Sequence, residues 1–170
     1  MKKRLCAALA LLACLAAAAC RSEYRDGSPL QISVTDLSGT PILLSFPHEQ
    51  VTILNLWATW CVPCKAEIKN LTELVVEGRM QGCRIMGIAL DSITPEHLKP
   101  AVAALSIPYP VYAGNADEIL KKTGVSAIPA TIFIDRSGTI VKRLVGYHAK
   151  EELQRAIEEV VAANKTGSAP

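Results

Sequence analysis

The sequence contains little cysteine and no extended patch of positive charge, and each shortage excludes a class of protein. Six cysteines occur among 170 residues, whereas a small scaffold held together by disulfides is much denser in cysteine. Binding of nucleic acid requires lysine and arginine gathered into a patch, and none is present beyond residues 2–4. We therefore exclude a disulfide-stapled scaffold and expect no nucleic-acid partner.

Long apolar runs are also missing. A transmembrane helix needs ~20 consecutive apolar residues, and the run from Leu5 to Ala19 is shorter. It follows three basic residues and ends in small ones, which is the pattern of a secretory signal. We predict a signal peptide over residues 1–19, whose removal leaves 15 basic and 16 acidic residues and a formal charge of −1. We then expect the protein to be attached to the membrane by a lipid, as the next residues suggest; the alternatives are ordinary secretion without a lipid and a segment that stays uncleaved as an anchor.

The end of this segment resembles a bacterial lipoprotein signal, in which small residues precede the cysteine that receives the lipid. In "LAAAAC" the acceptor is Cys20, and "LLAC" offers Cys14 as a rival. The polar segment 20–29 behind it contains glycine and proline and is predicted to be a tether. These features predict an exported protein that is anchored by lipid at the cell envelope.

Hydrophobic patterning predicts one α/β domain over residues 30–164 and a disordered tail over 165–170. Alternation on either side of "DLSGTP" indicates an N-terminal β-hairpin, and continuous apolar runs indicate buried strands. The expected strands or extended segments are 30–35, 42–46, 51–58, 83–90, 107–112, 130–135 and 139–146, and the expected helices begin at residues 62, 95, 116 and 149. Pro100 should kink or split the second helix. This order predicts a mixed sheet with helices on both faces.

The segment "WATWCVPCK", residues 57–65, places two cysteines between a buried strand and a helix. Cys61 then lies at the helix N-terminus, where free amide groups and the helix dipole favour a thiolate. Such sites lower the pKa of a cysteine from ~8.5 to about 3.5–7.5. Cys64 lies one turn further into the helix, and Pro63 suits the first turn because it has no N–H. We predict that Cys61 attacks a disulfide and that Cys64 resolves the product.

The segments "NLWATWCVPCKAE" and "GVSAIPATIFIDRSGTIVKRLVG" resemble the thioredoxin superfamily, and within it the exported TlpA/ResA-like thiol–disulfide oxidoreductases. The likeness spans residues 30–161. It implies a thioredoxin fold with an added N-terminal hairpin, no cofactor, and a monomer that exchanges disulfides with proteins. It also implies a membrane reductant of the CcdA/DsbD type, and many relatives reduce apocytochrome c. The CVPC segment does not determine whether electrons flow in the reducing or the oxidising direction.

The resemblance also assigns residues around the cysteines. Pro129, preceded by Ile128, matches a proline that has a cis peptide bond and faces the cysteine pair; the alternative is a trans proline that bounds strand 130–135. Trp60 is expected at the surface as part of a substrate platform, with Val62 and Pro63 beside it. Trp57 is expected in the core, and the alternative is a structural role for both tryptophans.

An acid near the cysteines is a second expectation from the family. Cytoplasmic thioredoxin has an aspartate where this chain has Asn55, whereas ResA-like proteins carry an acid three residues after the second cysteine. Glu67 matches that position, one helical turn beyond Cys64, where it can alter the thiol pKa and pass a proton. The alternative is a first-turn glutamate favoured by the helix dipole.

Three rival hypotheses involve the same cysteines. A copper-binding or copper-delivery protein would need further ligands, and the candidates Cys83, His48, His97 and His148 show no recognised ligand spacing. The exported Sco-type copper proteins resemble this arrangement but have a CxxxC pair. The Pro-Thr-Cys pattern of a peroxidase is absent, and a structural disulfide over so short a loop would stabilise little. We expect no metal site, and we expect Cys83 to be an apolar filler with a redox role as the alternative.

Overall fold

The computed structural model describes residues 29–91 and 93–166, so the signal peptide, Cys14, Cys20 and most of the tether lie outside the described residues. Within the described part, seven strands form one sheet in the order β2-β1-β5-β4-β3-β6-β7. The strands are β1 (Gln31–Thr35), β2 (Pro41–Ser45), β3 (Val51–Trp57), β4 (Cys83–Ala89), β5 (Val111–Gly114), β6 (Ala130–Ile134) and β7 (Ile140–Val145). The helices are α2 (Val62–Val76), α3 (Pro95–Ala104), α4 (Ala116–Thr123) and α5 (Lys150–Thr166).

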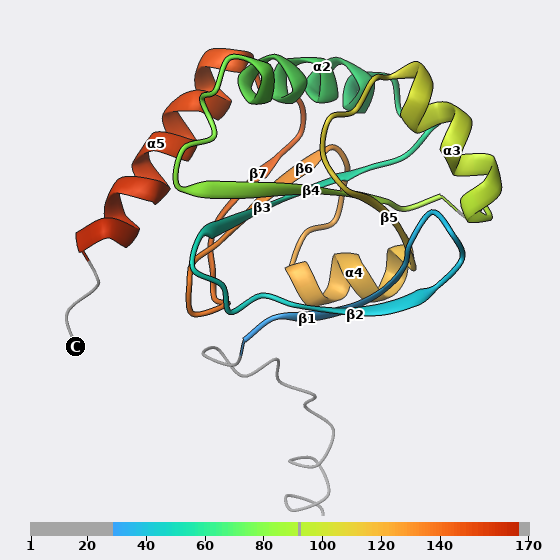
Figure 1. Ribbon diagram of the computed structural model, residues 1–170, viewed down its shortest axis with the longest axis horizontal. Coiled ribbons are helices and arrows are strands. Elements are labelled where there is room, and N and C mark those ends of the chain that lie inside the picture. The colour runs from blue at the N-terminus through green and yellow to red at the C-terminus, as the bar shows by residue number, and fades with distance from the viewer. Residues whose placement is uncertain (1–28, 92, 167–170) are drawn as a thin grey trace, which may run out of the picture.

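The sheet is mixed, as predicted. Strands β3, β4 and β5 are parallel, whereas β6 and β7 are antiparallel to their neighbours. The N-terminal hairpin of β1 and β2 joins the sheet through β1, which pairs with β5. Figure 1 shows α2, α3 and α5 on one face of the sheet and α4 on the other. The predicted α/β fold with an added hairpin and helices on both faces is confirmed.

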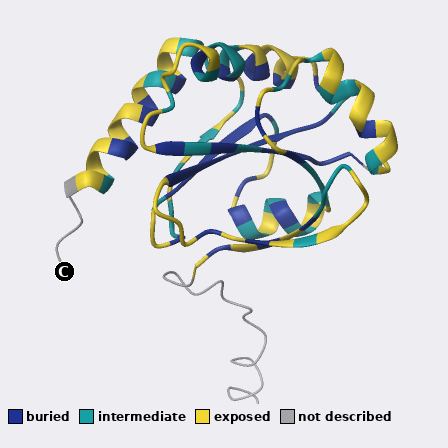
Figure 2. Cartoon of the chain, in the orientation of Figure 1, coloured by how far each residue is buried: buried dark blue, intermediate teal, exposed yellow. Residues whose placement is uncertain are grey.

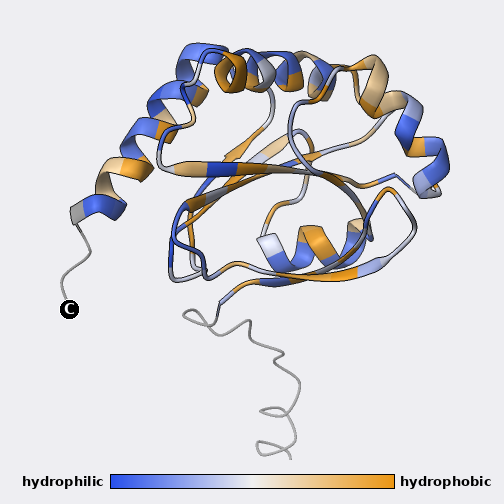
Figure 3. Cartoon of the chain, in the orientation of Figure 1, coloured by the Kyte–Doolittle hydropathy of each residue, from blue (hydrophilic) through white to orange (hydrophobic). Residues whose placement is uncertain are grey.

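Burial follows the apolar pattern of the sequence. Every residue of β3 and β6 is buried, because helices cover both faces of these central strands. Figure 2 shows these strands in the buried colour, and Figure 3 shows apolar residues along the sheet with polar residues on the outer sides of the helices. The core therefore consists of one layer on each side of the sheet.

The two strands of each β-hairpin are joined by a five-residue turn of the same type. Asp36 Oδ1 accepts hydrogen bonds from the amides of Ser38 at 2.8 Å and Thr40 at 2.9 Å. In the second turn, between β6 and β7, Asp135 accepts from two amides with the same spacing, at 2.9 Å each. The glycine at the fourth position of each turn has a positive φ, which favours glycine. The "DLSGT" and "DRSGT" segments therefore set both hairpins locally.

Three details differ from the expectations. Strand β5 begins at Val111, so only the end of the expected segment 107–112 is in the sheet. Helix α3 continues through Pro100 and is not split, because residues 96 and 100 are exposed and water can satisfy the carbonyl that loses its partner. Helix α5 extends to Thr166, two residues beyond the predicted end of the domain at 164.

Candidate active site

Cys61 and Cys64 form a disulfide at the start of α2. Cys61 is the N-cap residue, and its Sγ accepts a hydrogen bond from the Cys64 amide at 3.3 Å. Cys61 is 4% exposed and Cys64 is fully buried. The sulfur that faces the unpaired amides of the helix N-terminus is therefore also the one that a partner can reach, as the sequence predicted.

The loop between β3 and the disulfide is held by a residue that the sequence analysis did not identify. Asp91, two residues beyond the end of β4, accepts hydrogen bonds from the Thr59 amide at 2.9 and 3.0 Å and from the Thr59 hydroxyl at 2.6 Å. Asp91 is 8% exposed, so these bonds are shielded from water. The sequence did contain a signal for Asp91, because a polar residue at the carboxyl end of a buried parallel strand often lies at a functional site.

The surface around the cysteines is apolar and exposed. Trp60 is 71% exposed and Val62 is 74% exposed, while Trp57 is fully buried, as predicted for the two tryptophans. The peptide bond between Ile128 and Pro129 is cis, which confirms the expectation from the family. Ile128 also packs against the buried cluster that contains both cysteines.

Trp60 and Ile128 border one groove. It has a volume of about 350 Å³ and is lined by Trp60, Leu90, Ala116, Leu120, Ser126, Ala127 and Ile128. One wall is α4, and another is the loop that leads to Pro129. Because the lining carries almost no charge or polarity, the groove suits an apolar side chain located next to a bound disulfide.

Glu67 lies below the cysteines with no exposed surface. Its Oε1 accepts hydrogen bonds from the Thr131 hydroxyl at 2.9 Å and from the Asn55 amide at 3.4 Å. Its Oε2 accepts from the backbone amide of His148 at 2.9 Å. Glu67 is the sixth residue of α2, and the first turn contains no acidic residue, so the alternative of a first-turn glutamate is wrong.

Burial raises the pKa of Glu67 above its ordinary value, although the His148 amide, the Thr131 hydroxyl and the nearby imidazole of His148 each oppose this effect. A carboxyl group with a raised pKa holds a proton more readily than an ordinary glutamate, and Glu67 lies one helical turn from Cys64. The structure thus shows a buried acid one helical turn from Cys64, and its role in proton transfer stays a prediction.

The strands next to Glu67 place polar residues at neighbouring positions of the sheet. Asn55 on β3 lies opposite Thr131 on β6 and Gly87 on β4. A Cβ atom at Gly87 would lie 3.3 Å from the Tyr109 ring and 3.4 Å from Trp57 Nε1, so glycine leaves room for both rings. Burial raises the pKa of Tyr109, and the negative charge of Glu67 adds to this rise. Tyr109 thus remains a neutral phenol next to the carboxyl group.

Cys83 lies away from the disulfide. It is a buried free thiol whose Sγ donates to the Met80 carbonyl at 3.3 Å. Burial raises the pKa of Cys83 to about 11, and the residue packs in the apolar cluster between the sheet and α5. A protonated, buried thiol agrees with the prediction of an apolar filler.

The candidate metal ligands are dispersed. Within residues 29–91 and 93–166, no group of three or more histidine, cysteine or acidic side chains is arranged to hold a metal ion. His148 Nδ1 lies 3.4 Å from Glu152 Oε2, and His97 Nδ1 lies 3.0 Å from the hydroxyl of Thr94. None of the helices in these ranges combines the length and apolarity needed to cross a membrane.

A mixed sheet of this topology, a CxxC disulfide at a helix N-terminus and a cis-proline beside it define a thioredoxin-fold thiol–disulfide oxidoreductase. A sequence model of the AhpC/TSA family matches residues 27–143, and the chain belongs to that family. Thiol-disulfide oxidoreductase ResA of Bacillus thuringiensis subsp. konkukian is 31% identical over 127 residues, which cover 75% of this chain and 73% of that protein. The chain is thus a ResA-like member of the thioredoxin superfamily.

Solved structures share the fold. The thioredoxin-family thiol:disulfide interchange protein of Chlorobium tepidum aligns with a TM-score of 0.64 and 24% identity, over 82% of this chain and 99% of that chain. StoA of Bacillus subtilis aligns with a TM-score of 0.62 and 21% identity, over 76% of this chain and 97% of that chain. These likenesses support the α/β arrangement described above.

Proposed function

We propose that this protein is an exported reductase of protein disulfides that uses Cys61 and Cys64. The disulfide at the N-terminus of α2, with Cys61 as its accessible member, carries the proposal. In the reduced protein, the Cys61 thiolate attacks one sulfur of a substrate disulfide. A bond forms between Cys61 Sγ and that sulfur, and the other substrate sulfur leaves as a thiolate.

The second step belongs to Cys64. After losing its proton, the Cys64 thiolate attacks Cys61 Sγ, forms the Cys61–Cys64 disulfide and releases the remaining substrate thiolate. Glu67 accepts the proton of Cys64, because it lies one turn away on α2 and burial raises its pKa above that of an ordinary glutamate. The step transfers two electrons to the substrate and leaves the protein oxidised.

The apolar surface around Cys61 supports a polypeptide substrate. We propose that the substrate segment lies between Trp60 and the Ile128–Pro129 peptide, with Val62 and Pro63 at its other side. An apolar side chain near the substrate cysteine would occupy the groove that Trp60 and Ile128 border. Burying the exposed tryptophan ring would contribute binding free energy without requiring charge complementarity.

The N-terminal sequence and the family resemblance support a proposal for the location and the partners. We propose cleavage of residues 1–19, lipid attachment at Cys20, and action as a monomer at the outer side of the membrane. Electrons would arrive from a membrane dithiol protein of the CcdA/DsbD type, which reduces the Cys61–Cys64 disulfide. Apocytochrome c, whose thiols must be reduced before haem attachment, is the substrate that we propose to test first.

The reduction potential tests the direction of electron flow. A soluble form that begins at Ser22 is equilibrated against graded dithiol buffers, and the Cys61–Cys64 disulfide is quantified by mass spectrometry. A potential near or below about −230 mV agrees with a reductase, whereas about −180 to −120 mV would make the protein an oxidase or isomerase. Failure to form the disulfide at any potential would refute both. In parallel, Cys64→Ser should trap the substrate on Cys61 as a mixed disulfide.

A further inference from the structure

The loop between β7 and α5 brings a titratable side chain to the buried carboxyl group. The backbone amide of His148 donates to Glu67 Oε2 at 2.9 Å, and its carbonyl accepts from Asn70 Nδ2 at 3.1 Å. These two bonds hold the backbone of His148 against α2. Its side chain is only 24% exposed, so most of the imidazole lies in the interior.

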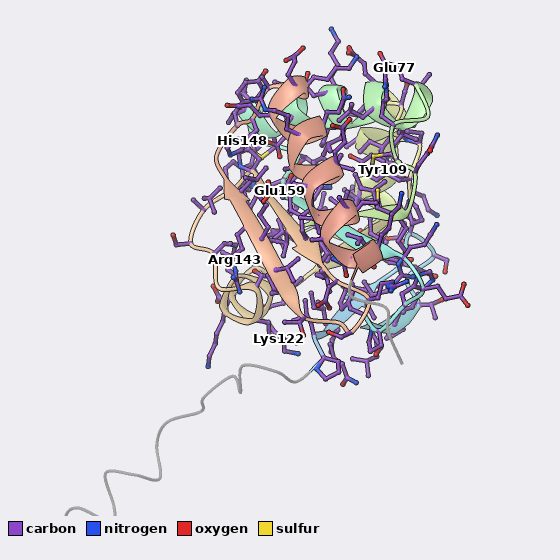
Figure 4. All side chains as sticks on the ribbon, turned by 90° about the vertical axis from the view of Figure 1, so that its left-hand side faces the viewer. Glu77, Tyr109, Lys122, Arg143, His148 and Glu159 are labelled. Carbon is purple, nitrogen blue, oxygen red and sulfur yellow. A yellow bond between two sulfur atoms is a disulfide. The ribbon has the colours of Figure 1, made fainter. Side chains whose placement is uncertain are left out.

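The two ring nitrogens of His148 have different surroundings. Nδ1 lies 3.4 Å from Oε2 of Glu152, whose side chain is 51% exposed. Nε2 is buried and, within the part of the chain that the structure describes, has no hydrogen-bond partner. The imidazole also interacts electrostatically with Glu67. The ring therefore spans from the interior beside Glu67 to a solvent-facing carboxylate, and Figure 4 shows it beyond the end of β7, beside α5.

Glu67 needs such a connection because its hydrogen-bond partners cannot carry its proton away. These partners are a hydroxyl group, a side-chain amide and a backbone amide, all of which donate to the carboxylate. None of them is a base at neutral pH. Imidazole is the side chain that gains and loses a proton near neutral pH, and its two nitrogens allow it to accept a proton on one side and release one on the other.

We propose that His148 relays protons between Glu67 and solvent in each redox cycle, an inference that rests on the proposed function. When Cys64 is oxidised, its proton passes to Glu67 and then, through one bridging water, to Nε2 of His148, which makes no direct hydrogen bond to the Glu67 carboxyl group. Nδ1 releases its own proton to Glu152 or to water, so one proton leaves the interior. His148 acts through Glu67 and is a positioning residue, not one that reacts with the substrate.

The return half of the cycle restores the starting state. When a membrane dithiol reduces the Cys61–Cys64 disulfide, the Cys64 thiolate takes a proton from Glu67. His148 then gives the Nε2 proton to the Glu67 carboxylate through the same bridging water, and Nδ1 takes a proton from solvent. The imidazole thus regains its first tautomer without rotating, and the proton count balances over the cycle.

Other charged and titratable groups surround this loop and enter the pH dependence. The ammonium group of Lys150, at the start of α5, contacts Glu73 of α2 and Glu77, the C-cap residue of that helix, which hold its charge away from the relay. The hydroxyl of Tyr147 accepts from Asn70. Tyr109, which stays a neutral phenol, interacts with Glu67, and Glu152 lies beside His148.

The test measures the resolving step by itself. Reduced full-length protein is mixed with a peptide disulfide in a single turnover, and Trp60 fluorescence follows decay of the mixed disulfide from about pH 5.5 to about 8.5. In His148→Ala we expect this step to slow about tenfold near neutral pH, and added imidazole should restore it. His148→Gln should be equally slow without restoration, because glutamine fills the space. His97→Ala, which alters an exposed imidazole on α3, should match the wild type.

The outcomes separate the relay from its alternatives. Wild-type rates and pH profiles in both His148 variants would overturn the relay. A slow His148→Ala protein that imidazole does not restore would also overturn it, because the side chain would then only support the loop. If the wild-type protein forms no mixed disulfide with the peptide, the proposed function itself fails and the relay fails with it.

Discussion

Replacing Glu67 by glutamine should raise the thiolate fraction of Cys64 and yet slow the resolving step that Cys64 performs. Cys64 and Glu67 are three residues apart on α2, a spacing that places side chains about 5–6 Å apart. Two negative charges at about 6 Å repel by about 3 kcal/mol at an effective dielectric constant near 20. Removing the Glu67 charge should therefore raise the thiolate fraction of Cys64 about a hundredfold at a given pH above the Glu67 titration.

The resolving step should nevertheless become slower. In the wild type, transfer of the proton from Cys64 to Glu67 moves one negative charge without creating a second one. In Glu67→Gln the proton must leave the interior without that base, and loss of general acid–base catalysis lowers a rate by about a hundredfold or more. Attack by Cys61 on the substrate should remain within about threefold of the wild type, since that thiolate does not depend on the transfer.

Two assays measure these effects. Alkylation of Cys64 against pH, in a Cys61→Ser background and followed by mass spectrometry, reports the thiolate. Cys83 does not interfere, because burial raises its pKa to about 11. Stopped-flow single turnovers report the resolving step. Glu73→Gln, which changes a 42% exposed acid on the same helix, is the matched control. If the alkylation profile of Cys64 against pH is the same with Glu67 and in the Glu67→Gln variant, the reasoning is refuted.

Three further predictions concern binding and stability. Trp60→Ala should raise KM for a protein disulfide about tenfold, with little change in KM for a small disulfide reagent. Because the ring is 71% exposed, the free energy of unfolding in urea should change by less than about 0.5 kcal/mol. A KM for the protein disulfide equal to that of the wild type would contradict the substrate platform. Gly114→Ala should destabilise the fold by about 1–3 kcal/mol. The reason is that the alanine Cβ would lie 2.1 Å from Ile119 Cδ1 and 2.8 Å from Ile88 Cγ2. An unchanged midpoint of urea unfolding would show that these two side chains repack freely. Since folding raises the pKa of Glu67, the folded state binds its proton more tightly, and stability should fall as pH rises from the unfolded value of 4.5 through the folded value. Glu67→Gln should remove that decline, and a constant difference between the two proteins from about pH 4 to about pH 8 would exclude the linkage.

Local sequence was sufficient for much of the fold. The apolar runs located β3, β4 and β6, and the "D-x-S-G-T" turns placed the hairpins, because these patterns act over a few residues. Errors occurred where solvent or pairing decided the outcome. Pro100 remains within α3 because its face is exposed, and β5 is displaced because only Val111–Gly114 meets neighbouring strands.

The functional residues divide in the same way. The sequence by itself determined the cysteine pair at a helix start and, through the family resemblance, the cis-proline and Glu67 as a candidate acid, since these depend on short spacings and motif order. Only the tertiary structure revealed Asp91 below the active-site loop and His148 against Glu67, which are 32 and 81 residues from their partners. Such contacts depend on the order of strands and on how α5 returns to α2. No local pattern encodes them, because burial and proton exchange are properties of the packed interior.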